Sequence, residues 1–133
     1  MILVDTSVLV NLFRGLRTPG VALLRTVIQE ELPFGIPDIC AMEVLQGARD
    51  AREWGLLTEY LGSQIRLTPE DPWAVHVEAA RIFFDCRRAG ITVRGSIDCL
   101  VAAMTLALGG VLLHEDRDYE RIARVRPLRF LTA

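Results

Sequence analysis

The chain has 133 residues, 51% of them hydrophobic, and a formal net charge of −2. This length suits one domain with an ordinary hydrophobic core. All 15 basic residues are Arg, which excludes a Walker A phosphate loop and aspartyl-phosphate signalling chemistry because both need a Lys.

The chain opens with MILVDTSVLV, an apolar run that Asp5 interrupts. The aspartate comes too early for the apolar region of a secretory signal peptide. Residues 2–4 predict a strand, and the helical spacing of Val8, Leu9 and Leu12 predicts a helix directly after Asp5. Because a buried carboxylate without a partner costs several kcal/mol, Asp5 must lie at an edge or hold a partner.

Helices and strands alternate along the rest of the chain. Thr18 and Pro19 predict a helix start as N-cap and first helical residue, and Asp38, Ser96 and Asp116 are predicted to cap later helices. The predicted helices cover 38 to about 49, 51–61, 69–88, 96 to about 108, and the residues after 116; the further strands are predicted at 34–37, 65–67, 111–114 and 128–131. This alternation predicts one α/β domain, with a mostly parallel central sheet flanked by helices on both faces.

The sequence favours a soluble, cytoplasmic protein. Its longest apolar stretch, residues 100–113, contains Thr105 and two glycines and is shorter than the roughly 20 residues of a membrane span. Cys40, Cys86 and Cys99 are odd in number and widely spaced, which predicts reduced thiols in the core.

Acidic residues follow two of the predicted strands. Asp5 comes directly after the first strand, and Asp116 comes just after the strand at 111–114, with Asp118 two residues further on. Ligands of parallel α/β sheets bind at the carboxyl ends of the strands, so these acids are predicted to reach the same edge.

Glu43 in ICAMEVL and Asp98 in SIDCLVAAM are single charges in apolar surroundings. Taken alone, each acid has a structural explanation: the aspartates could cap helices, and Glu43 could pair with a buried Arg. One shared site explains all four acids together. Four converging carboxylates repel one another unless a cation joins them, and hard oxygen ligands without Cys or His select Mg²⁺ or Mn²⁺.

Arginines are frequent near the predicted site. Arg14, Arg17 and Arg94 fall in loops or at helix ends, and the segment 117–129 holds five more. They form either a solvated helix face or a surface that follows a phosphate backbone around a metal centre.

Four blocks of the sequence, DTSVLV, MEVLQG, RGSIDCLVAA and HEDRDYERIA, resemble the PIN-domain family, specifically the VapC-type toxins of bacterial toxin–antitoxin pairs. The blocks occur in the order and spacing of that family, from Met1 to about Phe130. The resemblance implies that residues 1–133 form one PIN domain.

The resemblance also implies an Mg²⁺-dependent endoribonuclease, with Mn²⁺ as an alternative ion. Asp5, Glu43, Asp98 and Asp116 match the acidic quartet of the family as catalytic and metal-binding residues. Asp5 and Asp98 would be direct ligands, and Asp116 and Glu43 would hold waters or a second ion. A metal-activated water would then attack the scissile phosphorus.

Further positions take roles from the same resemblance. Asp118 matches an auxiliary acid, and Ser7 matches the small polar residue that orients the first aspartate. His114 stands where many relatives have Thr, and ending the strand is the favoured role over contacting substrate. The predicted substrate-binding residues are Arg94, Arg117 and Arg14.

The expected partners are RNA, a second copy of the chain and a small antitoxin that lies along a groove. A candidate groove, or else part of the core, is formed by the apolar residues Leu12, Phe13, Trp54, Leu57 and Tyr60.

Other functions fit the sequence less well. VDTS lacks the Gly of the aspartic-protease motif, and the residues after it have helical spacing. Ser96, Asp98 and His114 could be read as a hydrolase triad, but no G-x-S-x-G motif is present. Within the resemblance, a structure-specific DNA nuclease and a catalytically silent interaction module remain as alternatives.

Overall fold

Four short strands form the centre of the structure, a computed structural model that describes residues 1–133. β1 (Ile2–Val4) pairs with β2 (Phe34–Pro37) on one side and with β4 (Val111–Leu113) on the other, and β3 (Arg66–Leu67) extends the sheet beyond β2. All pairs are parallel, in the order β3-β2-β1-β4. The carboxyl ends of the strands therefore meet at one edge.

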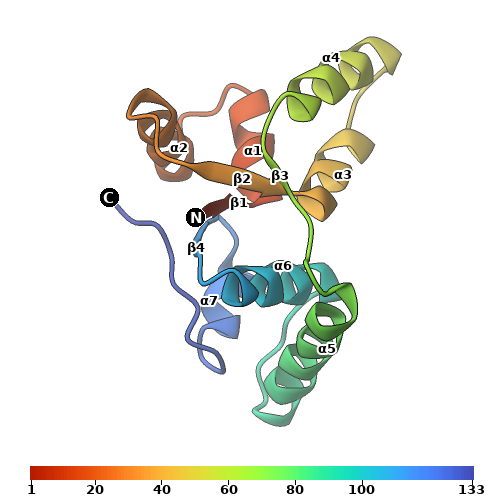
Figure 1. The fold of residues 1–133 in the computed structure, drawn as a ribbon, viewed down its shortest axis with the longest axis vertical. Coiled ribbons are helices and arrows are strands. Elements are labelled where there is room, and N and C mark those ends of the chain that lie inside the picture. Colours follow the sequence, from red (N-terminus) through yellow and green to blue (C-terminus); the bar gives the residue numbers. More distant parts are fainter.

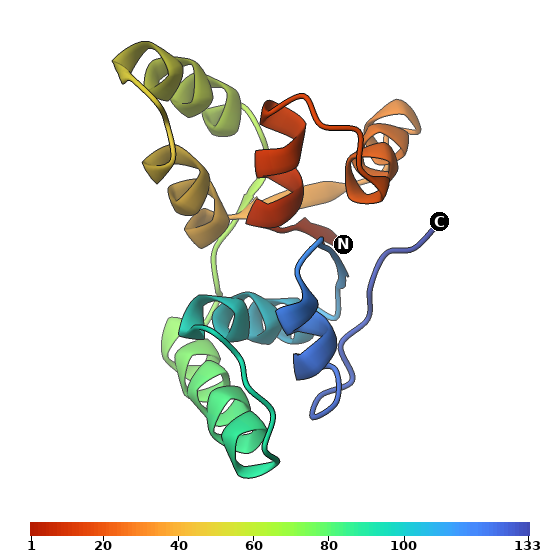
Figure 2. The same cartoon turned by 180° about the vertical axis from the view of Figure 1, so that it is seen from behind.

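Seven helices cover the two faces of this sheet, as predicted (Figure 1). They are α1 (Thr6–Phe13), α2 (Pro19–Gln29), α3 (Asp38–Gln46), α4 (Ala51–Gly62), α5 (Pro72–Arg88), α6 (Ser96–Ala107) and α7 (Arg117–Ile122). Figures 1 and 2 show α1 to α4 on one side of the sheet and α5 to α7 on the other. None of the helices combines the length and the hydrophobicity that crossing a membrane requires.

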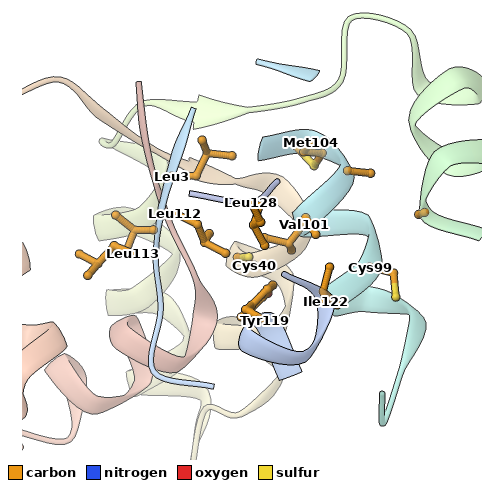
Figure 3. Packing of buried hydrophobic residues seen from close by; sticks show 14 of the residues in the cluster. Leu3, Cys40, Cys99, Val101, Met104, Leu112, Leu113, Tyr119, Ile122 and Leu128 are labelled. Atoms are coloured by element: carbon orange, nitrogen blue, oxygen red, sulfur yellow. The ribbon is translucent and has the colours of Figure 1, made fainter. Parts of the chain in front are cut away.

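The core lies between the central strands and the helices on both sides. Leu3 of β1 and Leu112 of β4 are 0% exposed, because a parallel strand covered on both faces places apolar side chains at successive positions. Figure 3 shows them near Val101 of α6, with Tyr119 and Ile122 of α7 beside this helix. Burial of one such side chain contributes about 1.5–3 kcal/mol.

Local sequence signals determine several element boundaries as predicted. β1 and β2 occupy the predicted residues, and α1 begins directly after Asp5. Thr18 caps α2 by accepting a hydrogen bond from the Val21 N–H at 3.1 Å, and Pro19 is the first helical residue. Asp116 is the N-cap of α7.

Two predicted caps were wrong. Asp38 and Ser96 are the first residues inside α3 and α6, and their N-caps are Pro37 and Gly95, neither of which makes a side-chain capping bond. The long helix predicted from residue 69 begins at Pro72, where the Asp71 carboxylate accepts a hydrogen bond from the Ala74 N–H at 3.1 Å.

The strand predicted at 128–131 was also wrong. Only Phe130 bridges to Leu112. The segment bonds to β4 at Leu112, whose N–H donates to the Arg129 carbonyl and whose carbonyl accepts from the Leu131 N–H. One bridge does not make a ladder, so the sheet ends at β4.

Candidate active site

Asp5 lies where β1 passes into α1, and it is only 4% exposed. Its Oδ2 accepts hydrogen bonds from the Ser7 N–H at 3.0 Å and from the Ser7 hydroxyl at 2.6 Å. Its Oδ1 accepts one from the Tyr119 hydroxyl at 2.6 Å and a longer one from the Cys40 thiol at 3.7 Å. The carboxylate inside the apolar run therefore has partners on both oxygens, as its burial requires.

The two side chains that donate to Oδ1 stay protonated. Burial raises the pKa of the Tyr119 hydroxyl, and the charge of Asp5 raises it further. Burial also raises the pKa of the Cys40 thiol, again with Asp5 as the second cause. Tyr119 and Cys40 therefore act as fixed hydrogen-bond donors to the aspartate. Cys86 and Cys99 are likewise buried and free.

Three acids meet beside this junction. Asp98 of α6, Asp116 and Asp118 each place a carboxylate oxygen within 4.8 Å of the others. Burial, followed by the charges of Asp116, Asp5 and Asp118, raises the pKa of Asp98 to about 7. Burial and the surrounding acids therefore both disfavour the charged form of Asp98.

Asp118 is the acid that the protein itself neutralises. It is fully buried, and its Oδ2 accepts hydrogen bonds from the Arg94 N–H and from Nε of Arg94, both at 3.2 Å. Its Oδ1 accepts a hydrogen bond from Nη1 of Arg121 at 2.6 Å. Burial alone would raise the pKa of Asp118, but the hydrogen bonds from Arg121 and Arg94 outweigh burial and hold the pKa below its ordinary value.

Asp116 and Asp98 keep oxygens that no donor of the chain occupies. Oδ1 of Asp116 accepts hydrogen bonds from Nη2 of Arg94 and from the Asp118 N–H, both at 2.9 Å, whereas its Oδ2 has no protein donor. No hydroxyl or N–H group of the chain donates to Asp98. Free carboxylate oxygens with excess negative charge are the donor set that hard divalent cations prefer, so these residues fit a metal ion.

Glu43 of α3 faces the same site. It lines one shallow depression of about 480 Å³ together with Asp98, Asp116, Asp118 and Arg94. Its Oε1 accepts a hydrogen bond from the Thr6 hydroxyl at 2.7 Å. The structure therefore places three of the four predicted acids on one depression, and the fourth, Asp5, close enough for its charge to raise the pKa of Asp98.

His114 supports the loop that carries Asp116. Its Nδ1 accepts a hydrogen bond from the Asp116 N–H at 3.0 Å, and its ring packs on Phe130 with the centroids 4.5 Å apart. Burial lowers the pKa of His114, so the ring is neutral near pH 7.

The predicted substrate-binding arginines lie in different surroundings. The Arg94 side chain is 72% exposed above Asp116, and Arg117 is exposed at the start of α7. Arg14 lines a second hollow, of about 380 Å³, which includes Glu43 and therefore adjoins the acidic depression.

Nothing in the sequence indicated that several further residues would contact the acids of the site. Thr6, Cys40 and Tyr119 reach the acids only through the fold, and Tyr119 lies 114 positions from the aspartate that it contacts. Glu115 turns away from its neighbour Asp116: its Oε1 accepts hydrogen bonds from Nδ2 of Asn11 at 3.2 Å and from the Thr18 hydroxyl. Adjacent acids in the chain thus point to different sides of the loop.

Comparison with known families and sequences gives one consistent result. The family model described as PIN domain matches residues 2–125. The chain is 35% identical over 131 residues to the VapC ribonuclease Mb1587 of Mycobacterium bovis and, at the same identity, to the ribonuclease VapC11 of Mycobacterium tuberculosis. Each match covers 97% of this chain and 96% of the relative.

Solved structures share the fold. VapBC-1 from nontypeable Haemophilus influenzae matches with a TM-score of 0.75 and 20% identity, covering 99% of this chain and 98% of the other. FitAcB from Neisseria gonorrhoeae matches with a TM-score of 0.71 and 18% identity, over 99% and 97% of the two chains. VapBC2 from Rickettsia felis, bound to a promoter DNA fragment, matches with a TM-score of 0.74 and 14% identity, over 100% and 99%.

Proposed function

The chain belongs to the PIN-domain family, and from this premise we propose that it is a metal-dependent endoribonuclease and the toxin of a toxin–antitoxin pair. Its relatives in two mycobacteria are named VapC ribonucleases and cover nearly the whole chain. The neighbouring structures include VapBC pairs. We propose further that residues 1–133 act as one PIN domain and work in the cytoplasm.

The observation that carries this proposal is the meeting of acids from distant segments at one sheet edge. Oxygens of Asp98, Asp116 and Asp118 lie within 4.8 Å of one another, and Glu43 lines the same depression. Burial, followed by the charges of Asp116, Asp5 and Asp118, raises the pKa of Asp98 to about 7, and a divalent cation would favour the charged form of this carboxyl.

Asp5, Glu43, Asp98 and Asp116 form the proposed catalytic and metal-holding set. Asp98 and Oδ2 of Asp116 offer free oxygens, and Glu43 lines the same depression. Asp5 lies close enough for its charge to raise the pKa of Asp98. Mg²⁺, or Mn²⁺ in its place, fits this oxygen-only set. Such an ion supplies Lewis acidity for the hydrolysis of a phosphodiester bond, by acidifying water and offsetting negative charge at the phosphate.

The other side chains of the site position the catalytic acids or neutralise their charge. Ser7 and Tyr119 fix the orientation of Asp5, and Asp118 holds Arg94 at the rim. The exposed guanidinium of Arg94 can bind an RNA phosphate, and Arg14 and Arg117 extend the basic surface.

An antitoxin partner is supported by the hollow beside the site. The Phe13 and Tyr60 rings meet at 5.3 Å, and both are 37% exposed, as expected for the edge of a groove. The neighbouring hollow is lined by Val10, Phe13 and Leu57 and includes Glu43. A peptide segment bound there would reach the acidic depression. We also propose a homodimer.

The assay is cleavage of single-stranded RNA by the purified protein in Mg²⁺ or Mn²⁺. Cleavage is expected to stop in excess EDTA, and Asp98→Asn should lower the rate at least about 100-fold, the scale of losing one charge-stabilising group. Glu120→Gln, at an exposed acid of α7, is the matched control and should keep its activity. Undiminished cleavage in EDTA would contradict the metal assignment.

The same assay separates the alternative functions. DNA of the same sequence tests for a DNA nuclease, and absence of cleavage with either substrate and either ion would identify a silent binding module. Sequencing of the new 5′ ends would then define the RNA that is cut.

A further inference from the structure

Glu115 is an acid of the active-site loop that does not line the acidic depression. It lies between His114 and Asp116, in the loop that follows β4. Its Oε1 accepts hydrogen bonds from Nδ2 of Asn11 at 3.2 Å and from the Thr18 hydroxyl. Glu115 forms no ion pair. Two neutral donors, one in α1 and one at the start of α2, therefore hold this carboxylate away from its acidic neighbour.

Gly20, the second residue of α2, leaves the space that this carboxylate occupies. The glycine is buried, and a Cβ added to it would lie 2.6 Å from Cγ, Cδ and Oε1 of Glu115. Its backbone lacks the positive φ that would itself call for glycine, and glycine is otherwise unfavourable in a helix. A free side chain would move aside from an added Cβ, but Glu115 would lose its bonds to Asn11 and Thr18 by doing so. The position of Glu115 therefore explains the glycine.

The main chain of Glu115 is linked to Asp5. Its N–H donates to the Ser7 hydroxyl at 2.9 Å, and this hydroxyl donates to Oδ2 of Asp5 at 2.6 Å. A hydroxyl has one proton and two lone pairs, so the Glu115 N–H fills an acceptor position and the proton remains for Asp5. Figure 2 shows the loop between β4 and α7 next to the start of α1.

Asp116 is joined to these helices only through its neighbour. Its carboxylate and its N–H bond to Arg94, His114 and Asp118, none of which belongs to α1 or α2. All hydrogen bonds between residues 114–116 and residues 7–18 are made by Glu115. One residue is therefore linked to both Asp5 and Asp116, which come from different strands.

We propose that Glu115 is a positioning residue, which holds Asp5 and Asp116 in a fixed arrangement, and that Gly20 is the position that admits its carboxylate. The inference rests on the proposed function, because it concerns two acids of the metal-holding set. Glu115 faces away from the depression and contacts neither the ion nor RNA. Loss of its hydrogen bonds frees the loop and lowers the affinity for the ion, while the core of the fold stays intact.

Calorimetric titration with Mn²⁺ tests the role of Glu115. Glu115→Ala should raise the Mn²⁺ dissociation constant about tenfold, as is usual when a residue that orients metal ligands is removed. Glu115→Gln keeps an acceptor oxygen for Asn11 and Thr18, so it should bind Mn²⁺ as the wild type does. If Glu115→Gln loses as much affinity as Glu115→Ala, the residue acts through its charge, and the positioning role is wrong.

Gly20→Ala tests the same contact from the opposite side. The added methyl group displaces the Glu115 carboxylate and should also weaken Mn²⁺ binding about tenfold. In the double variant with Glu115→Ala the space is vacant, so the dissociation constant should equal that of Glu115→Ala alone. Gly55→Ala, where an added carbon of α4 points into open space, is the matched control and should bind as the wild type does. Additive losses would show that Gly20 does not act through Glu115.

RNA cleavage separates positioning from folding. In Glu115→Ala, kcat should fall about tenfold and KM for RNA should stay nearly unchanged, because the side chain faces away from the depression. Urea unfolding of the same variant measures its stability. A variant that loses stability but keeps the kcat and the Mn²⁺ affinity of the wild type would make Glu115 a purely structural contact and overturn the proposal.

A readout without metal keeps this inference separate from the nuclease activity. The N–H groups of Ser7 and Asp118 donate to the carboxylates of Asp5 and Asp116, so their amide NMR resonances report both acids. In EDTA these resonances should shift in Glu115→Ala and in Gly20→Ala, but not in Glu115→Gln or Gly55→Ala. If the wild type neither binds Mn²⁺ nor cleaves RNA, the proposed function fails and these resonances still decide the inference. Unchanged resonances in Glu115→Ala would overturn it.

Discussion

Burial, followed by the charges of Asp116, Asp5 and Asp118, raises the pKa of Asp98 to about 7 in the metal-free fold. In the unfolded chain the same carboxyl titrates near 3.8, so the folded state binds this proton more tightly. The contribution of Asp98 to the stability of the metal-free protein therefore declines as the pH rises from about 4 to about 7, and it changes little above that range.

Asp98→Asn should consequently stabilise the metal-free protein at pH 8. We expect a gain of about 1–3 kcal/mol in the free energy of unfolding, measured with urea in EDTA, because the amide removes a poorly compensated charge. The gain should shrink as the pH falls and disappear below about pH 3, where the wild-type carboxyl is protonated in both the folded and the unfolded state. Equal stability of the two proteins at pH 8 would show that the charge is already compensated.

Asp118 titrates in the opposite sense. Burial raises its pKa, but hydrogen bonds from Arg121 and Arg94 outweigh burial and lower it. The stabilisation is therefore present above the ordinary carboxyl pKa and is lost as the pH falls through the lowered value. Asp118→Asn should cost about 2–3 kcal/mol at pH 7, as expected for a buried carboxylate that loses charged partners. Urea unfolding checks this, and a cost that stays the same at pH 2 would contradict it.

At the scale of elements, Arg126 fastens the C-terminal segment to α5. Its side chain is 19% exposed, and it donates from Nε to Glu78 at 2.7 Å and from Nη2 to Asp85 at 2.9 Å. Arg126→Ala should cost about 1–2 kcal/mol, because both carboxylates are partly exposed and solvent screens them. Arg126→Lys should recover little of this loss in thermal unfolding, since one ammonium cannot reproduce the forked geometry. Full recovery by Lys would mean that charge alone matters.

Element types were predictable where the spacing of apolar residues changes sharply. The change at Asp5 marks the step from β1 to α1, and Thr18 followed by Pro19 marks the start of α2. The caps at Asp38 and Ser96 were mispredicted because an acid or a hydroxyl in the first turn has the same sequence signal as an N-cap. The prediction of a strand at 128–131 was wrong because a strand forms only where a neighbouring strand offers a ladder of hydrogen bonds, and the local sequence pattern does not show whether one is present.

At the scale of the whole molecule, metal binding should stabilise the fold. The acidic depression joins α3, the start of α6 and the loop after β4, so an ion bound there links segments from both sides of the sheet. At 100 times the dissociation constant the gain is about 2.7 kcal/mol. Mn²⁺ should raise the melting temperature of the wild type in a concentration-dependent way and that of Asp98→Asn far less. An equal rise in both proteins would place the ion elsewhere.

The location of the candidate site was largely predictable from the sequence, but the hydrogen bonds and ion pairs within it were not. Parallel topology directs Asp5 and Asp116 to one sheet edge, and their place after predicted strands indicated as much. The pairing of Asp118 with Arg94 and Arg121 depends on loop conformations that no spacing encodes. The strand order, with β1 between β2 and β4, could not be predicted from the sequence either, because it depends on crossover connections that span whole helices.

The hydrogen bonds of Glu115 connect the N-terminal helices to the loop that carries Asp116. Its side chain is tied to Asn11 of α1 and to Thr18 at the start of α2, its N–H donates to the Ser7 hydroxyl at 2.9 Å, and the next peptide carries Asp116. A displacement of α2 would act on Glu115 through its hydrogen bond with Thr18, and Glu115 is covalently joined to Asp116. Residues of α1 and the start of α2 are therefore joined by hydrogen bonds to the residue that directly precedes Asp116.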